Sequence, residues 1–401
     1  MSMSRTKQWA LVLSGSAIVA ACVTNQLTGT CTDNATCPEW PPPGPADTGA
    51  DTSTDAGPRA RCEDLGADPN NCGTCGHSCF GGACAGGACL PVRVADFPGA
   101  TGLALAKGGV VVTADIYSGR DGVYYVPPDA DGGIVRLSSD RASAPSTDGV
   151  HACWILGWRQ ISCSLLDGGS PMATIDEMEF LQSILVHDGY VYWLANFKST
   201  WLRRASLSGD ASTTTLVTLD FYSNSTALLR DGDRFFWLTY RSSPDSNVVF
   251  EATFDGGAVE NLREAAALGT RWIRDLAVAR DVAYVSIDGY EGPDASEIGG
   301  IYRAPMRGDG GSVTPIRSQS LGDSRLAVDP SHIYYTDGKG GSVHRIPIPA
   351  TNADGGSIPA LDGGPETMAR GQGRLVGIAV DDRFVYWVSA GEDGGLMRLA
   401  K

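Results

Sequence analysis

The fold of most of this chain is indicated by Ile378-Ala379-Val380-Asp381-Asp382-Arg383-Phe384-Val385-Tyr386-Trp387-Val388-Ser389, followed after a Gly-rich turn by Leu396-Met397-Arg398-Leu399. It reads as an apolar strand, an Asp-rich turn, a strand with an aromatic pair and a third strand. Seven copies of this pattern can be aligned between residues 90 and 401. Their first strands begin near Leu103, Val150, Ile184, Ala227, Leu276, Leu326 and Ile378.

The spacing of these copies, about 35 to 50 residues, is typical of β-propeller blades. Asp-Gly and Asp-Gly-Gly turns recur between the strands, and such turns favour tight hairpins. The last copy lacks a fourth strand, which residues 92–97 can supply by closing the ring. Residues 90–401 are therefore predicted to form an all-β propeller of about seven blades, or six if the first two copies form one irregular blade.

One copy, Ile333-Tyr334-Tyr335-Thr336-Asp337, resembles the motif of YWTD propellers, and more loosely the NHL and Kelch-like repeats. The resemblance implies propeller architecture for residues 90–401. It implies no single function, because propellers host binding and several enzyme classes. The aromatic pairs are expected to pack between blades, since aromatic residues favour strands.

The N-terminus reads as an export signal over residues 1–21. Arg5 and Lys7 precede an apolar run that is too short to span a bilayer. Val19-Ala20-Ala21-Cys22 resembles the lipobox of bacterial lipoproteins, which implies lipidation of Cys22 and membrane anchoring through the lipid. Val23 rather than Asp follows, which implies the outer membrane or cell surface, with the periplasmic face as the alternative. An ordinary secretory signal remains the other interpretation of this segment.

Residues 22–61 are rich in Pro, Asp, Thr and Gly and are predicted to be a disordered tether in which Cys31 and Cys37 form a small disulfide loop. Residues 62–89 hold six cysteines: Cys62, Cys72, Cys75, Cys79, Cys84 and Cys89. So short a segment needs covalent support, which predicts disulfides in an oxidising compartment. Zinc binding through Cys72, Cys75, His77 and Cys79 is the alternative. The segment resembles cysteine modules of exported myxobacterial proteins, which implies a bacterial lineage.

Cys153 and Cys163 fall on neighbouring strands of the second copy and are predicted to form a cross-strand disulfide, with a redox-active pair as the alternative. The formal charge of −15 argues against nucleic-acid binding, because such a chain repels phosphate.

The sequence contains no recognisable catalytic, metal or cofactor motif, so no catalytic residue, metal or cofactor is predicted. Structural roles are expected for His151, His187, His332 and His344. Asp176, Glu177 and Glu179 are expected to form a solvated connection between blades, with calcium binding or acid–base chemistry as the alternative.

The sequence therefore favours a membrane-tethered, extracytoplasmic binding or scaffold module without catalysis. A protein or glycan partner is expected on the propeller face that carries the long loops. The candidate ligand-binding residues are Tyr117, Phe197, Trp201, Tyr240, Arg241 and Tyr290. The alternative is an extracytoplasmic propeller enzyme, a lyase or hydrolase resembling the streptogramin lyases. That function would require histidines and carboxylates to converge on one face.

Overall fold

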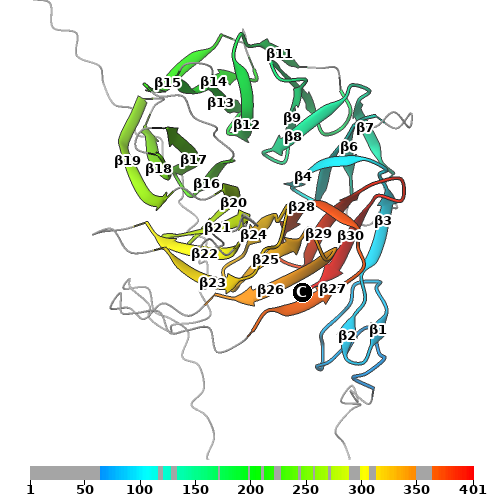
Figure 1. The fold of residues 1–401 in the computed structure, drawn as a ribbon. Coiled ribbons are helices and arrows are strands. Elements are labelled where there is room, and N and C mark those ends of the chain that lie inside the picture. Colours follow the sequence, from blue (N-terminus) through cyan, green and yellow to red (C-terminus); the bar gives the residue numbers. More distant parts are fainter. Residues whose placement is uncertain are drawn as a thin grey trace, which may run out of the picture. The chain divides into compact units, whose positions relative to one another are not determined.

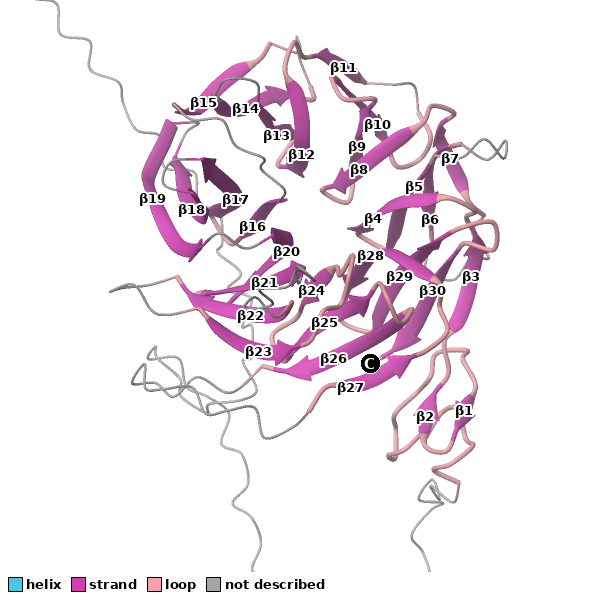
Figure 2. Ribbon diagram, in the orientation of Figure 1, coloured by secondary structure: helices cyan, strands magenta, loops and turns pink. Residues whose placement is uncertain are grey.

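The computed structural model describes residues 64–115, 121–127, 133–169, 172–196, 199–208, 212–220, 227–242, 245–255, 258–269, 272–288, 299–306, 313–348 and 364–401. The chain divides into Met1–Arg61, which is not described, and the unit Cys62–Lys401. The described residues form strands, turns and loops (Figures 1 and 2). No helix in this part of the chain is long and apolar enough to cross a membrane.

Seven four-stranded antiparallel sheets are arranged around a ring as propeller blades (Figure 1). Blade 1 contains β4 (Ala100–Ala106), β5 (Gly109–Ala114), β6 (Gly122–Val126) and β7 (Val135–Ser138). Blade 2 contains β8 (Ala142–Thr147), β9 (His151–Leu156), β10 (Gln160–Leu165) and β11 (Ala173–Asp176). Blade 3 contains β12 (Phe180–His187), β13 (Tyr190–Asn196), β14 (Thr200–Ser206) and β15 (Thr214–Leu219).

Blades 4 to 6 have the same order of strands from the ring centre outward. Blade 4 contains β16 (Ala227–Asp231), β17 (Arg234–Ser242), β18 (Asp245–Asp255) and β19 (Ala258–Gly269). Blade 5 contains β20 (Trp272–Ala279), β21 (Val282–Asp288), β22 (Gly300–Pro305) and β23 (Thr314–Ser318). Blade 6 contains β24 (Leu326–Val328), β25 (His332–Asp337), β26 (Ser342–Pro347) and β27 (Glu366–Ala369).

Blade 7 joins the two ends of the domain. It contains β28 (Arg374–Val380), β29 (Phe384–Ala390) and β30 (Gly395–Ala400), and its outer strand is β3 (Val92–Asp96). β3 runs antiparallel to β30, with Val92 opposite Arg398 and Ala95 opposite Leu396 (Figure 1). The predicted closing strand and the seven blades are confirmed, and the six-blade alternative is wrong.

The first strand of blade 2 was mispredicted. Val150 lies in the turn before β9, and the first strand is β8, which reads Ala-Ser-Ala-Pro-Ser-Thr. This strand has no apolar run, and Pro145 sits where its pairing with β9 is irregular, between Ser143 and Ser146. Proline is tolerated there because β8 is an edge strand and the residue need not donate to the ladder.

The aromatic pairs of the second strands fill the cores between blades, as predicted. In blade 3, Tyr192 packs in the core shared with blade 4 and Trp193 in the core shared with blade 2. In blade 4, Phe236 faces blade 5 and Trp237 faces blade 3. In the equivalent pairs, too, the first residue packs toward the following blade and the second toward the preceding one. These pairs are Val111 and Val112, Cys153 and Trp154, Tyr284 and Val285, and Tyr334 and Tyr335. Because neighbours on a strand point to opposite faces, each pair joins its blade to both adjacent blades.

Bulges in the first strands link neighbouring blades around the central channel. The hydroxyl of Ser183 accepts a hydrogen bond from the Leu228 amide at 3.1 Å, and Asp275 accepts one from the Leu326 amide at 2.8 Å. Both acceptors lie where the pairing register shifts. Blade 1 has Gly102 at this place, because a Cβ atom there would lie 2.6 Å from Pro145 of blade 2.

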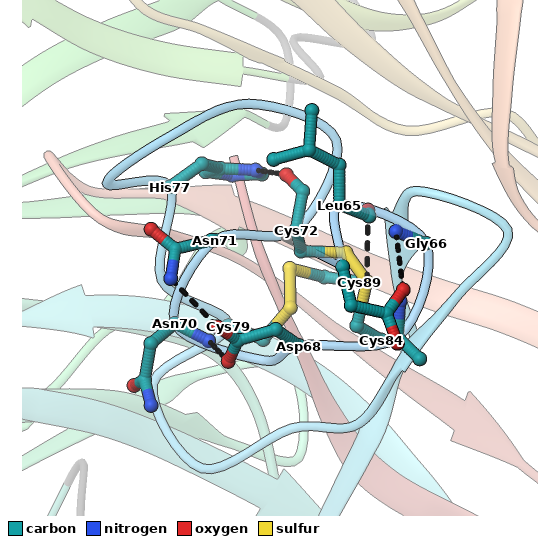
Figure 3. Close-up of a disulfide and its surroundings, with 12 residues drawn as sticks. Leu65, Gly66, Asp68, Asn70, Asn71, Cys72, His77, Cys79, Cys84 and Cys89 are labelled. Atoms are coloured by element: carbon teal, nitrogen blue, oxygen red, sulfur yellow. Dashed lines mark hydrogen bonds between the residues drawn. A yellow bond between two sulfur atoms is a disulfide. The ribbon is translucent and has the colours of Figure 1, made fainter. Parts of the chain in front are cut away.

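The cysteine-rich module is held by disulfides that lie side by side (Figure 3). It contains the short strands β1 (Cys84–Ala85) and β2 (Ala88–Cys89). Cys72 is bonded to Cys84 and Cys79 to Cys89, and Cys75 is also disulfide-bonded. Cys72 and Cys79 therefore have no free thiolates for the zinc site considered above. Cys22, Cys31, Cys37 and Cys62 lie outside the described residues.

The module contacts blade 7 directly. The Phe80 ring packs edge-on against Phe384 at 5.3 Å between centroids, and the Arg383 guanidinium lies over both rings. The His77 ring nitrogens lie 2.6 Å from the main-chain oxygen of Cys72 and 2.7 Å from that of Lys401. The module thus contacts the closing blade as well as leading into β3.

Cys153 and Cys163 are directly opposite on β9 and β10 and form the predicted cross-strand disulfide. Both residues are fully buried in the core between blades 2 and 3.

Replacing Trp387, which has an exposed fraction of 0%, tests the role of the aromatic pairs. Trp387→Ala should lower the free energy of unfolding by about 3–5 kcal/mol, because it leaves a cavity between blades. Trp158→Ala is the matched control, because Trp158 is 71% exposed, and it should change stability by no more than about 0.5 kcal/mol. Denaturant unfolding measures both, and equal losses would contradict the packing role.

Candidate functional site

Three large apolar side chains are exposed together on one face of blades 2 and 3. We call the side with the loops between second and third strands, and the connections between blades, the upper face; the turns between first and second strands form the lower face. Trp158 is 71% exposed, Met178 86% and Phe180 41%. Trp158 lies in the β9–β10 turn, and Met178 and Phe180 lie where β11 leads into β12. We call these three residues and Arg159 the blade 2–3 patch.

Main-chain hydrogen bonds hold the backbone of this patch on both sides. Gly157 has a φ of 60°, which allows the tight turn before Trp158. The main-chain oxygen of Trp158 accepts a hydrogen bond from the Leu181 amide at 2.8 Å, and that of Arg159 accepts one from the Glu177 amide at 2.7 Å. The Arg159 guanidinium lies 5.3 Å from the Phe180 ring centroid. The exposed side chains are thus presented on an ordered backbone.

A buried charged cluster lies at the base of the patch. Arg203 forms ion pairs with Glu177 and, at 3.1 Å, with Glu179. The Trp193 indole donates a hydrogen bond to Glu177 at 3.2 Å. Arg203 also lies 5.0 Å from the ring centroid of Trp201. The expectation of a solvated connection is wrong for Glu177, which is only 8% exposed, because it accepts hydrogen bonds from the facing blade.

The two carboxyl groups of this cluster are shifted in opposite directions. Burial raises the pKa of Glu177 to about 7, its neighbour Glu179 adds to the rise, and Arg203 opposes it. Burial by itself would raise the pKa of Glu179, but hydrogen bonds from Glu177 and Arg203, together with the Arg203 charge, lower it below its ordinary value. Glu177 therefore holds the proton of the pair up to about neutral pH.

The predicted ligand-binding residues are only partly described. Tyr117, Phe197 and Tyr290 lie outside the described residues. Trp201 is in β14 beside the buried cluster, whereas Tyr240 and Arg241 are in β17 of blade 4. The prediction of a loop at Tyr240 and Arg241 is wrong, because β17 and β18 continue as a long hairpin in which Arg241 pairs with Ser246.

Trp158, Met178 and Phe180 were missed by the sequence prediction, which looked for binding residues in the longest loops. The sequence feature that could have revealed the patch is Trp158, a large aromatic residue at the tip of a turn that is too short to bury it.

The lower face has a cavity of about 1000 Å³ at the mouth of the central channel. Carboxylates of the turns line it, including Asp148, Asp329 and Asp381. Each caps its own turn: the Asp381 carboxylate, for example, accepts hydrogen bonds from the amides of Arg383 and Phe384, both at 2.7 Å. These carboxylates therefore stabilise turns.

The histidines do not form a catalytic group in the described part of the chain. Only His187 lines the channel mouth. His151 contacts the Asp148 carboxylate at 3.0 Å, His332 contacts the Ser331 hydroxyl at 2.8 Å, and buried His344 stacks on Tyr335. His187 lies at the channel mouth with the carboxylates of Asp148, Asp188, Asp329 and Asp381, whereas no second histidine of the described residues lines this mouth.

Comparison with known proteins supports the fold alone. No known protein family matches the sequence, and no curated protein is a detectable relative. Among solved structures, the Swd1 propeller domain of Myceliophteria thermophila is similar with a TM-score of 0.54 and 9% identity, covering 78% of this chain and 99% of that one. A chain of a mitotic checkpoint complex has a TM-score of 0.53 and 12% identity, covering 78% and 93%. A prolyl endopeptidase has a TM-score of 0.50 and 13% identity, covering 76% of this chain and 47% of its own.

The raised pKa of Glu177 predicts a pH-dependent contribution to stability. Between its ordinary value of 4.5 and its folded value of about 7, the folded state keeps a proton that the unfolded state has lost. The contribution of Glu177 to the free energy of unfolding therefore decreases as the pH rises through this range. Glu177→Gln should raise the unfolding temperature, relative to the unsubstituted chain, more at about pH 8 than at about pH 5. Asp176→Asn is the control for removing one carboxylate, and an equal effect of Glu177→Gln at both pH values would contradict the assignment.

Proposed function

We propose that this chain is an exported, lipid-tethered scaffold that docks a protein partner through the blade 2–3 patch and performs no catalysis. The observation that carries this proposal is the exposed set of Trp158, Met178 and Phe180 on a backbone fixed by hydrogen bonds. Aromatic residues, Met and Arg are enriched at protein interfaces, and a preordered backbone reduces the entropy that is lost on binding.

The partner is expected to offer an apolar pocket for the Trp158 indole, with polar groups around it. An indole that enters such a pocket is a typical energetic centre of an interface. The charge of −15 favours a partner with a basic surface, because opposite charges speed the encounter. Propellers of this fold also occur in assemblies, since one similar chain comes from a mitotic checkpoint complex.

The tether is supported by the sequence of the first 61 residues. An apolar segment ending in Val19-Ala20-Ala21-Cys22 precedes a stretch rich in Pro, Thr and Asp. The disulfides of the module and of blade 2 are consistent with an oxidising compartment outside the cytoplasm. An anchor with a long tether would let the propeller reach partners at or above the membrane surface.

Photo-crosslinking tests the patch directly. A photoreactive amino acid at position 158 should yield one defined protein adduct in intact envelopes, and the same group at position 262 should not, because Leu262 is exposed on β19 away from the patch. Trp158→Ala combined with Met178→Ala should reduce binding of the identified partner at least about 30-fold, as loss of an interface hot spot does. Leu262→Ala is the matched control. Equal adducts at both positions, or unchanged binding by the double variant, would contradict the proposal.

The lipid anchor has its own test. Cys22→Ser should leave an unlipidated chain that partitions into the aqueous phase of a detergent extract, because the lipid supplies the membrane affinity. Intact-mass measurement should show the loss of the acyl chains. If the mass differs only by the exchange of sulfur for oxygen and the partition is unchanged, Cys22 is not lipidated.

A further inference from the structure

A second pocket lies on the lower face between blades 3 and 4, away from the patch. Its volume is about 380 Å³, the size of a small-molecule site. It is lined by His187, Asp188, Tyr190, Tyr192, Arg204, Arg230, Asp233, Phe235 and Phe254. Four of these nine residues are Tyr or Phe, and two carry a guanidinium group.

The aromatic side chains form one continuous wall. The Phe235 ring lies 4.8 Å from Tyr192 and 4.6 Å from Phe254, measured between centroids. Tyr190 lies 6.3 Å from Tyr192. Burial raises the pKa of the Tyr192 hydroxyl, although a hydrogen bond from Arg204 and the Arg204 charge oppose the rise, so Tyr192 stays neutral and does not compensate that charge. The wall offers apolar, flat surface to a ligand.

Arg204 occupies a position that recurs in the repeat. On the third strand of blades 3, 5, 6 and 7, an arginine stands directly opposite the first aromatic residue of the second strand. The pairs are Tyr192 with Arg204, Tyr284 with Arg303, Tyr334 with Arg345, and Tyr386 with Arg398. Residues opposite each other share one face of the sheet, so each arginine points toward the following blade.

The arginines at this position have hydrogen-bond acceptors of different kinds. Arg345 forms an ion pair with Glu366 at 2.8 Å, Arg303 donates to the Thr314 hydroxyl at 2.9 Å, and Arg398 donates to the main-chain oxygen of Phe80 at 3.4 Å. Arg204 lies over the Tyr190 ring, 4.7 Å from its centroid, and hydrogen-bonds the neutral Tyr192 hydroxyl. Within the described part of the chain, no carboxylate lies within 4.0 Å of the Arg204 guanidinium group. It is therefore a cation in a largely aromatic pocket without an anionic partner.

The remaining polar groups of the pocket also suit an anion. Arg230 has a long contact with Asp233, at 4.0 Å, and Asp233 is almost fully exposed. Burial and the nearby Arg230 charge lower the pKa of His187, which leaves the imidazole neutral and able to donate a hydrogen bond. Asp188 is mostly exposed and contacts His187 at 2.9 Å. The two carboxylates thus lie in solvent, where their charge is screened.

We propose that this pocket binds a small aromatic carboxylate, with the carboxylate on Arg204 and Arg230 and the ring against Tyr190, Phe235 and Phe254. Arginine suits this role because its planar fork matches a carboxylate and makes charge-assisted hydrogen bonds. The neighbouring channel mouth shares His187, Asp188 and Arg230 with the pocket, which gives a ligand a route in from solvent.

Titration calorimetry with three matched probes tests this proposal: 3-phenylpropionate, its neutral amide, and 3-phenylpropylamine. The carboxylate should bind, and the amide should bind at least about tenfold more weakly, because it loses the charge-assisted contact. Stronger binding of the amine than of the carboxylate would show an aromatic cage for cations and overturn the proposal. The absence of carboxylate binding at millimolar concentration would overturn it as well.

Variants assign the binding to Arg204. Arg204→Gln should weaken carboxylate binding at least about tenfold, and Arg204→Lys should retain part of it because the charge remains. Arg303→Gln is the matched control, since it removes the equivalent arginine of blade 5, which does not line the pocket. Thermal unfolding of each variant checks that it is folded. If Arg204→Gln does not fold, the binding measured with Arg204→Lys tests the assignment instead. Equal losses in the Arg204 and Arg303 variants would refute the assignment.

Discussion

The pairing of β3 with β30 is the interaction on which the rest of the structure depends. These strands lie at opposite ends of the domain, and their register places Val92 beside Arg398. The buried cores lie between neighbouring blades, and the core around blade 7 joins blades 6, 7 and 1 with the cysteine module, so each core requires its neighbouring blades to be in place. An open ring would expose the cores beside blade 7 and leave β30 as an unpaired edge. The disulfide-held module contacts the same blade through Phe80 and therefore supports the closure.

Blade 3 shows how one repeat can support two different surfaces. Trp193 and Arg203 face blade 2 and, with Glu177, form the base of the exposed upper patch. Their sequence neighbours Tyr192 and Arg204 face blade 4 and line the lower pocket. The alternation of side chains along a strand thus sends adjacent residues to separate surfaces. The repeat provides the frame, and differences between copies at equivalent positions provide the candidate sites.

The sequence predicted the fold from local signals: paired aromatic residues, Asp-rich turns and a last copy that lacked a strand. It failed at β8, where Pro145 and polar residues hide a strand that only its neighbours define. It also failed for Glu177, because burial by a facing blade leaves no mark on the linker's own sequence. The lower pocket could not be foreseen, since residue type alone does not show that Arg204 meets the neutral Tyr192 hydroxyl whereas Arg345 meets the Glu366 carboxylate. Such differences depend on contacts between strands rather than on residue type.

A comparison of residues 62–401 with a chain that begins at Phe97, and so lacks β3 and the module, tests ring closure most directly. Circular dichroism and hydrogen exchange during denaturant unfolding would follow both chains. Closure predicts one cooperative transition for the longer chain. It predicts a lower midpoint, a smaller denaturant slope and fast exchange of the β30 amides for the shorter one. An unchanged midpoint, slope and protection of β30 in the shorter chain would contradict the account.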